Sequence, residues 1–221
     1  KYEETITQLN EAQDADCDLR EIARDAKLFL AKRDGQWEPY WWNQTRDRPR
    51  YTFDMTTPIV KQVSNALSEK QYDVTILPGN GETSKQDATF FNGIIRSIQN
   101  NSGARHVYSQ AARGMVVSGM DGWIVKHDYA TSNSFDQDLS VQKIHNFLES
   151  VWFDPGAQEM TRSDADSCWV LQMLAKRNYE KRFPKGSGLS LDQGLTHNAW
   201  YNKADSVIIG QCYYKKRVPV N

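Results

Sequence analysis

The sequence predicts an α+β protein, with helices mainly in residues 1–120 and antiparallel strands mainly in residues 121–221. In the first half, apolar residues recur at three- and four-residue spacing, as they do along one face of a helix. In the second half, short runs rich in Val, Ile and aromatic residues are separated by turn residues, which is typical of strands. Because a run of helices is followed by a run of strands, an α+β arrangement is the expected class.

Four helices are expected in the first half. The second opens at Thr57, a suitable N-cap, with Pro58 in its first turn. The fourth spans about 104–118 and ends before a glycine. The apolar positions that define the four helices are, in order, Leu19, Ile22, Ala26 and Phe29; Ile59, Val63, Ala66 and Leu67; Ala88, Phe91, Ile94, Ile95 and Ile98; and Val107, Ala111 and Met115.

Strand-like segments follow. The run "YDVTILP" (72–78) predicts a short strand, and residues 122–145 predict a hairpin with a long loop. The runs "SCWVLQM" (167–173) and "DSVIIGQCYYKKRVPV" (205–220) predict two more strands. Between them, "AKRNYEKRFP" predicts one short basic helix that stops at Pro184.

Composition bounds the function. The net charge is −1, so no overall excess of positive charge indicates nucleic-acid binding. Three dispersed cysteines, Cys17, Cys168 and Cys212, argue against a disulfide framework or a cysteine zinc site and favour a reducing compartment. No apolar run approaches the length of a membrane span. Since the chain starts at Lys1 without methionine, we expect it to be a piece of a longer protein.

Four carboxylates stand close together in "VWFDPGAQEMTRSDADSCWV": Asp154, Glu159, Asp164 and Asp166. A calcium loop of the EF-hand type needs alternating oxygen ligands, a glycine at position six and an acid at position twelve, and this segment has neither the glycine nor the acid there. An acid/base site would need partner residues, and no arrangement of histidine or serine near these carboxylates supplies them. We therefore expect a solvated loop between two strands.

The usual catalytic patterns are missing. The histidines at 106, 127, 145 and 197 have no metal-binding spacing, and the segment "PGNGE" lacks the ending of a phosphate-binding loop. No nucleophile elbow is present. The sequence thus predicts no catalytic centre, no metal and no cofactor.

The segment 36–50 is rich in aromatic residues and arginines. Three interpretations stay open: tryptophans packed in the core beside solvated arginines, a protein interface, or contact with nucleic acid through stacking and phosphate pairing. The candidate interface residues are Trp37, Tyr40, Trp41 and Trp42, and the candidate phosphate contacts are Arg46, Arg48 and Arg50.

Four stretches of the chain, 26–78, 87–125, 151–184 and 205–216, carry a specific order of motifs. The aromatic and arginine segment runs into a helix led by proline, "NGIIRSIQNNSGA" follows, and "FDPGA" and "SDA" precede a strand and a helix ending in "RFP". This order and spacing resemble the portal, or head-to-tail connector, proteins of short-tailed bacteriophages. One departure is Asp121, where the family more often has an aromatic or small residue.

The resemblance implies a non-enzymatic structural subunit: the N-terminal wing region of a longer portal chain, occupying residues 1–221. It implies a ring of about twelve subunits at one capsid vertex, through which double-stranded DNA is packaged and ejected. The implied partners are the large terminase subunit, scaffolding and capsid proteins, and head-completion or tail proteins, with no membrane. The implied location is the virion, after assembly in the host cytoplasm.

Two other classes remain in competition. One is a stand-alone nucleic-acid-binding module that uses the arginines and tryptophans of 36–50. The other is a hydrolase whose site is assembled from distant carboxylates, which would require two or three acids to converge in one pocket.

Overall fold

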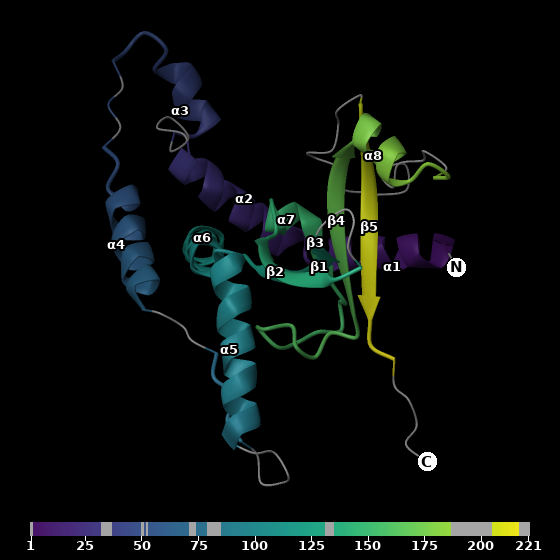
Figure 1. The fold of residues 1–221 in the computed structure, drawn as a ribbon. Coiled ribbons are helices and arrows are strands. Elements are labelled where there is room, and N and C mark those ends of the chain that lie inside the picture. The colour runs from purple at the N-terminus through teal and green to yellow at the C-terminus, as the bar shows by residue number, and fades with distance from the viewer. Residues whose placement is uncertain are drawn as a thin grey trace. The chain divides into compact units, whose positions relative to one another are not determined.

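The computed structural model describes residues 2–31, 37–49, 51, 53–70, 74–78, 85–130, 135–186 and 205–216. Helices fill the first half of the chain, and the antiparallel sheets lie in the second half, which confirms the α+β class (Figure 1). The chain divides into two compact units. The first contains Lys1–Ile22 and Asn146–Asn221, and the second contains Ala23–His145.

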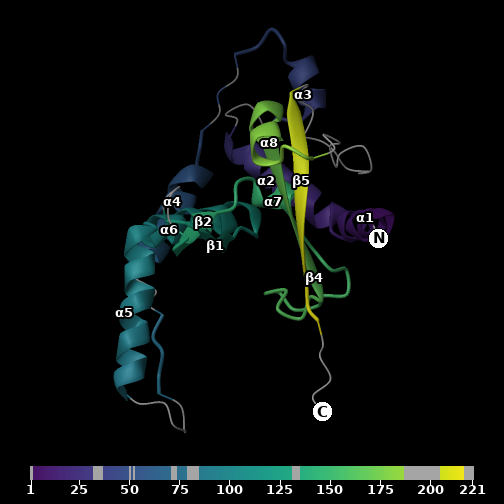
Figure 2. The ribbon, with the colours of Figure 1, turned by 45° about the vertical axis from the view of Figure 1, so that its right-hand side comes forward.

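The first unit is built on a three-stranded antiparallel sheet in the order β3-β4-β5. Its long strands are adjacent through nine residue pairs, from Ser167 opposite Tyr214 to Ala175 opposite Ser206. Figure 2 shows these strands side by side, with a short helix at one end. The elements are α1 (Tyr2–Ala15), the start of α2 (Cys17–Ala31), α7 (Phe147–Ser150), β3 (Val151–Phe153), β4 (Ser167–Ala175), α8 (Lys176–Arg182) and β5 (Ser206–Tyr214).

The core of this unit lies where α1 packs on the sheet. Trp152 of β3 pairs with Trp169 of β4, and both are buried. Leu9 and Ala12 come from the same face of α1, one turn apart, so they cover the sheet together. The remaining members of the cluster are Leu171 and Ile208. The strand predicted over 167–173 and the basic helix before Pro184 are therefore present. Of the strand predicted over 205–220, residues 206–214 form β5, residues 215 and 216 are not in a strand, and 217–220 lie outside the described ranges.

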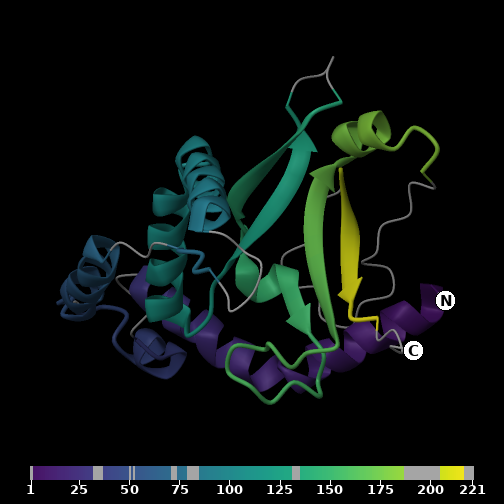
Figure 3. The same ribbon diagram turned by 60° about the horizontal axis from the view of Figure 1, so that its bottom comes forward.

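In its described residues, the second unit contains four helices after α2 and a two-stranded hairpin. Figure 3 shows these helices beside the hairpin. The predicted hairpin is confirmed, with Trp123 opposite Lys143 and Tyr129 opposite Gln137. Helices α5 and α6 pack against the hairpin, and α4 packs against α6. The elements are α3 (Pro39–Gln44), α4 (Thr56–Glu69), α5 (Lys85–Asn101), α6 (Ala104–Ser118), β1 (Trp123–Tyr129) and β2 (Gln137–Lys143).

The buried face of α6 consists of small residues at seven-residue spacing: Ala104, Ala111 and Ser118. Small side chains let the neighbouring helix and hairpin approach closely, and the Ser118 hydroxyl is satisfied by the carbonyls of Gly114 and Met120. Ala111 was correctly predicted to face inward. The prediction that Met115 faces inward is wrong. Met115 is 52% exposed, because α6 packs on its neighbours through the face of Ala104, Ala111 and Ser118.

The predicted buried face of α4 is also wrong. Ile59 and Val63 are exposed, and the buried residue of this helix is Ser64. The physical reason is a hydroxyl pair, since Ser68 of α4 lies 2.6 Å from Ser109 of α6 (Oγ to Oγ) and thereby turns the serine face inward. The predicted cap is shifted as well. The helix begins at Thr56, and the Asp54 carboxylate accepts the Thr57 amide at 2.9 Å.

Two further apolar faces are only partly buried. On α5, Ala88 is buried as expected, but Phe90, Phe91 and Ile94 are exposed. On α2, Leu19, Ile22 and Phe29 are exposed, while Arg20 and Ala23 are buried. These helices therefore present apolar side chains outward in the single chain.

No strand forms over 74–78, so that part of the predicted strand is wrong; residues 72 and 73 lie outside the described ranges. The backbone of Ile76 instead pairs with the side chain of Asn92 on α5. The Ile76 amide donates to Asn92 Oδ1 at 2.7 Å, and Asn92 Nδ2 donates to the Ile76 carbonyl at 3.1 Å. A single amide side chain thus satisfies both backbone groups that a neighbouring strand would otherwise pair.

The unusual Asp121 has a structural role at the start of the hairpin. It lies 3.2 Å from Lys143 Nζ and accepts the Gly122 amide at 2.8 Å. A side chain at position 114 would collide with this carboxylate, so the glycine there makes room for it. Within the described ranges, every helix is too short or too polar to cross a lipid bilayer.

Candidate functional site

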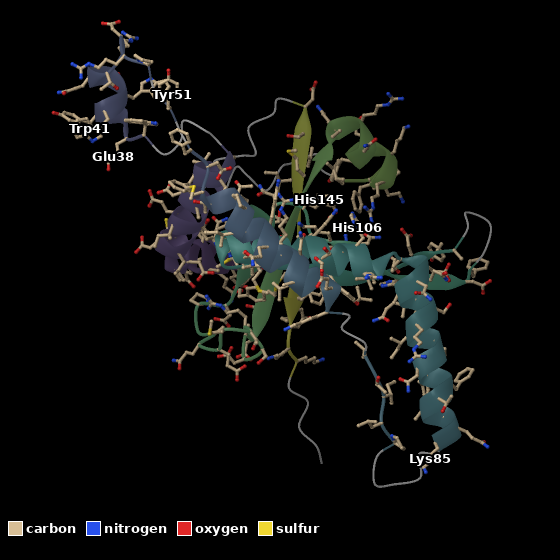
Figure 4. The ribbon with its side chains drawn as sticks, turned by 90° about the vertical axis from the view of Figure 1, so that its left-hand side faces the viewer. Glu38, Trp41, Tyr51, Lys85, His106 and His145 are labelled. Atoms are coloured by element: carbon tan, nitrogen blue, oxygen red, sulfur yellow. The ribbon has the colours of Figure 1, made fainter. Side chains whose placement is uncertain are left out.

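The short helix α3 presents the aromatic residues singled out in the sequence. Pro39 occupies the first helical turn, where its missing amide proton costs no hydrogen bond. Tyr40, Trp41 and Trp42 are 60%, 51% and 40% exposed, and Trp37, before the helix, is half-buried. Figure 4 shows the Trp41 side chain on this helix, and it labels Glu38 before the helix and Tyr51 after it. The three residues of α3 thus place large rings at the surface of the single chain.

These rings are held in defined positions. Tyr40 and Trp41 meet edge to face with centroids 5.3 Å apart, and Gln44 Nε2 donates to the Tyr40 hydroxyl at 2.9 Å. The Thr45 amide and hydroxyl both bond to the Trp41 carbonyl, which ends the helix. An ordered, exposed aromatic surface is suited to protein contact, because the side chains lose little conformational freedom on binding. The assignment of these residues to an interface stays a prediction.

The arginines after α3 are solvent-facing. Arg46 and Arg48 are exposed, and neither forms an ion pair with another described residue. Arg50 lies outside the described residues. Contact of these arginines with DNA phosphates stays a prediction.

The four carboxylates of 154–166 lie in a loop between β3 and β4, as expected. Two of them bond to the loop's own backbone: Asp154 accepts the Gly156 amide at 2.9 Å, and Asp164 accepts the Gln158 and Glu159 amides at 2.6 and 3.2 Å. The bond from Gln158 is the main cause that lowers the pKa of Asp164. The side chain of Glu159 accepts from the Ser163 hydroxyl. The carboxylates therefore shape the loop.

The described histidines come from separate elements. His106 lies on α6 beside Gln110, His127 is in β1, and His145 follows β2 (Figure 4). His197 lies outside the described residues. In the part of the chain that the structure describes, no group of three His, Cys, Asp or Glu side chains could hold a metal ion.

Sequence reasoning missed a buried arginine at the centre of the first unit. Arg20 of α2 is 1% exposed. Its guanidinium donates to the Leu148 carbonyl and, at 2.6 Å, to the Val151 carbonyl. The guanidinium carbon also lies 3.7 Å from the centroid of the Trp152 ring. These bonds join α2 to the α7–β3 corner, and they explain why the polar face of α2 is buried.

A second arginine extends this network. Asp16 lies between the two, 3.4 Å from Arg20 Nη2 and 3.0 Å from Arg162 Nη2. Arg162 also donates to the Ala157 carbonyl at 2.8 Å, so the network joins the junction of α1 and α2 to the carboxylate loop. The only sequence signal was an acid and an arginine four residues apart, the spacing of neighbours on one helix face.

Comparison with known proteins agrees with this architecture. The sequence model of the phage P22-like portal protein family matches residues 6–221. A portal protein of Acyrthosiphon pisum secondary endosymbiont phage 1 is 20% identical over 235 residues, which cover 100% of this chain and 32% of that relative. The molecule is thus a member of the bacteriophage portal class. The chain belongs to the phage P22-like portal protein family, as the resemblance predicted, and it spans about a third of the length of this curated relative.

Proposed function

We propose that this chain is the wing region of a portal subunit: part of a ring at the capsid vertex through which double-stranded DNA enters and leaves the capsid. The observation that carries the proposal is the family match over residues 6–221. In this proposal, residues 1–221 form the N-terminal part of a longer subunit. The mainly helical part is 1–120, and the part with strands and one short helix is 121–221.

The exposed residues of α3 support an assembly role. Tyr, Trp and Arg are the residue types most often found at the energetic centres of protein interfaces. Here Tyr40, Trp41 and Trp42 lie on a single short helix and keep much of their surface exposed. In the proposal they contact a neighbouring subunit, together with Trp37.

The proposed partners follow from this role. They are further copies of the subunit in a ring of about twelve, the large terminase subunit, scaffolding and capsid proteins, head-completion or tail proteins, and double-stranded DNA in the channel. The proposed subunit is not an enzyme and has no catalytic centre. It assembles in the host cytoplasm and remains in the virion.

Electron microscopy of the full-length protein tests the proposal. Closed rings with a fixed rotational symmetry are the expected result, and the images would also give the subunit number. A protein that remains monomeric at micromolar concentration, and does not form rings when mixed with scaffolding and capsid proteins, would contradict the proposal.

A second candidate function is a nucleic-acid-binding module. It is favoured by Arg46 and Arg48, which are exposed beside the aromatic helix and have no ion-pair partner among the described residues. A small monomer that binds short oligonucleotides would support the module. A ring of several hundred kilodaltons that binds them weakly would support the portal.

A further inference from the structure

A pocket in the second unit lies between α4, α5 and α6 and has a volume of about 410 Å³. Each helix or its end contributes one cation to the lining: Lys70 from the end of α4, Arg96 from α5 and Arg105 from the first turn of α6. None of the described residues that line the pocket is acidic. Such a concentration of one sign of charge in a concave site attracts an anion.

The lining also supplies neutral hydrogen-bonding groups. The hydroxyls of Ser68 and Ser109, 2.6 Å apart, belong to the lining and are half-buried. The amide side chains of Gln99 and Asn100 lie on the same wall. Charged groups around polar donors form a ligand site with orientation as well as attraction.

Two of the cations are available to a ligand. Lys70 and Arg105 are exposed and form no ion pair with any other described residue. Because like charges repel, these two cations beside one pocket favour a bound anion that neutralises them. The pocket also includes the start of α6, whose dipole end is positive, and the last turns of α4 and α5, whose dipole ends are negative, so the side-chain cations and not the helix ends supply the attraction.

We propose that this pocket binds a phosphate group. A planar guanidinium and a compact ammonium both pair with phosphate oxygens. The amide groups of Gln99 and Asn100 can donate to the remaining oxygens, whereas the Ser68 hydroxyl already donates to the Ser64 carbonyl. The chemistry is shared by free phosphate and by the phosphodiester of a nucleic acid. The proposal does not depend on the ring or on the aromatic residues of α3.

The test uses the full-length protein and two probes at constant ionic strength. Binding of radiolabelled orthophosphate is measured by equilibrium dialysis, and binding of a short fluorescent DNA duplex by anisotropy. The variant carries Lys70→Gln and Arg105→Gln, which remove two charges while keeping polar side chains. The control is Arg113→Gln. Arg113 is exposed on α6, the helix of Arg105, and does not line the pocket.

Wild type and the Arg113→Gln control should bind orthophosphate equally, and the double variant should bind it roughly tenfold more weakly, as expected when charge-assisted hydrogen bonds are lost. If the double variant also loses affinity for the duplex, the ligand of the pocket is the phosphodiester of a nucleic acid. If its affinity for the duplex is unchanged, the ligand is free phosphate. No saturable phosphate binding by wild type would overturn the proposal. So would equal losses in the double variant and the control, or preferential binding of a glutamate-rich peptide added as a carboxylate competitor.

Circular dichroism spectra and unfolding midpoints of all variants accompany the binding data. Both substituted positions are exposed, so the variants are expected to fold as wild type does. If the double variant misfolds, the single variant Arg105→Gln replaces it. Its affinity for orthophosphate should be about threefold lower than that of wild type. An unchanged affinity in this variant would contradict the proposed site.

Discussion

The guanidinium carbon of Arg20 lies over the Trp152 ring, 3.7 Å from the ring centroid, while the guanidinium nitrogens donate to the carbonyls of Leu148 and Val151. One buried cation therefore satisfies backbone acceptors and covers an aromatic face at the same time. Asp16 supplies the compensating charge, so the group can remain ionised inside the first unit.

Arg20→Met should destabilise the protein strongly. The change leaves two buried carbonyls without their donor and leaves Asp16 with Arg162 alone, so a loss of about 3–5 kcal/mol is expected. Urea unfolding followed by tryptophan fluorescence measures it. Arg182→Met is the matched control: Arg182 is exposed and lies 5.8 Å from the Phe183 ring, so its loss should cost less than about 1 kcal/mol. Equal midpoints for the two variants would show that the Arg20 network contributes little.

Gln13→Met should have the opposite effect. Gln13 is fully buried, and neither polar atom of its side-chain amide has a hydrogen-bond partner among the described residues. An apolar side chain of similar size removes the desolvation penalty, so a gain of about 1 kcal/mol or more is expected. Gln8→Met, at an exposed position of the same helix, should change the unfolding free energy very little. A loss of stability in Gln13→Met would mean that the amide is satisfied in solution.

Replacing Trp41 and Trp42 together with alanine should impair ring assembly more than folding. Trp41 and Trp42 keep 51% and 40% of their surface exposed in the single chain, so their truncation removes less intramolecular packing than truncation of a buried tryptophan would. The fraction of full-length protein in rings, counted by electron microscopy, should fall sharply while the unfolding midpoint stays close to that of wild type. Met160→Ala, which truncates a fully exposed apolar side chain, should leave the ring fraction unchanged. If the double variant is largely unfolded, and the molecules that do fold still form rings, the tryptophans serve the folding of the subunit and the interface prediction is wrong.

Binding to duplex DNA should be weak, independent of sequence and strongly dependent on salt. The charge of −1 and the small number of unpaired arginines near α3 allow only a few phosphate contacts, and each contact releases counterions. A salt titration with two unrelated duplexes measures this, and Arg46→Gln with Arg48→Gln should reduce the affinity that remains at low salt. Tight binding at physiological salt, or a preference for one duplex, would favour the nucleic-acid-binding module.

Cys168 should be almost unreactive at neutral pH. Burial, with a smaller contribution from neighbouring Cys212, raises the pKa of the Cys168 thiol to about 11. Alkylation followed by mass spectrometry measures the rate at which Cys168 is modified. In the folded protein this rate should rise between pH 9 and 11, and in urea it should already rise near pH 9. Because the folded pKa lies above the ordinary value of 9.0, the stability that this group contributes is present below pH 9 and is lost as the pH approaches 11. Rapid modification at pH 7 would contradict this.

The local elements were largely predictable from the sequence. The strand over 167–173, the hairpin in 122–145 and the basic helix before Pro184 follow from short-range patterns, because alternation, turn residues and proline act within a few positions. The order of motifs along the chain also sufficed to predict the portal family, since motif order is preserved in the sequence itself.

Which helix faces are buried was decided only by the tertiary structure. Hydrophobic spacing predicted that Ile59 and Val63 would face inward, but the contact between Ser68 and Ser109 turns α4 the other way. The expected strand at 74–78 was replaced by pairing between Ile76 and the side chain of Asn92, sixteen residues away. Arg20, an ordinary polar residue in the sequence, is buried because carbonyls more than a hundred residues later accept its protons. Periodicity reports only neighbours along the chain, whereas burial is determined by the groups that folding brings opposite each side chain.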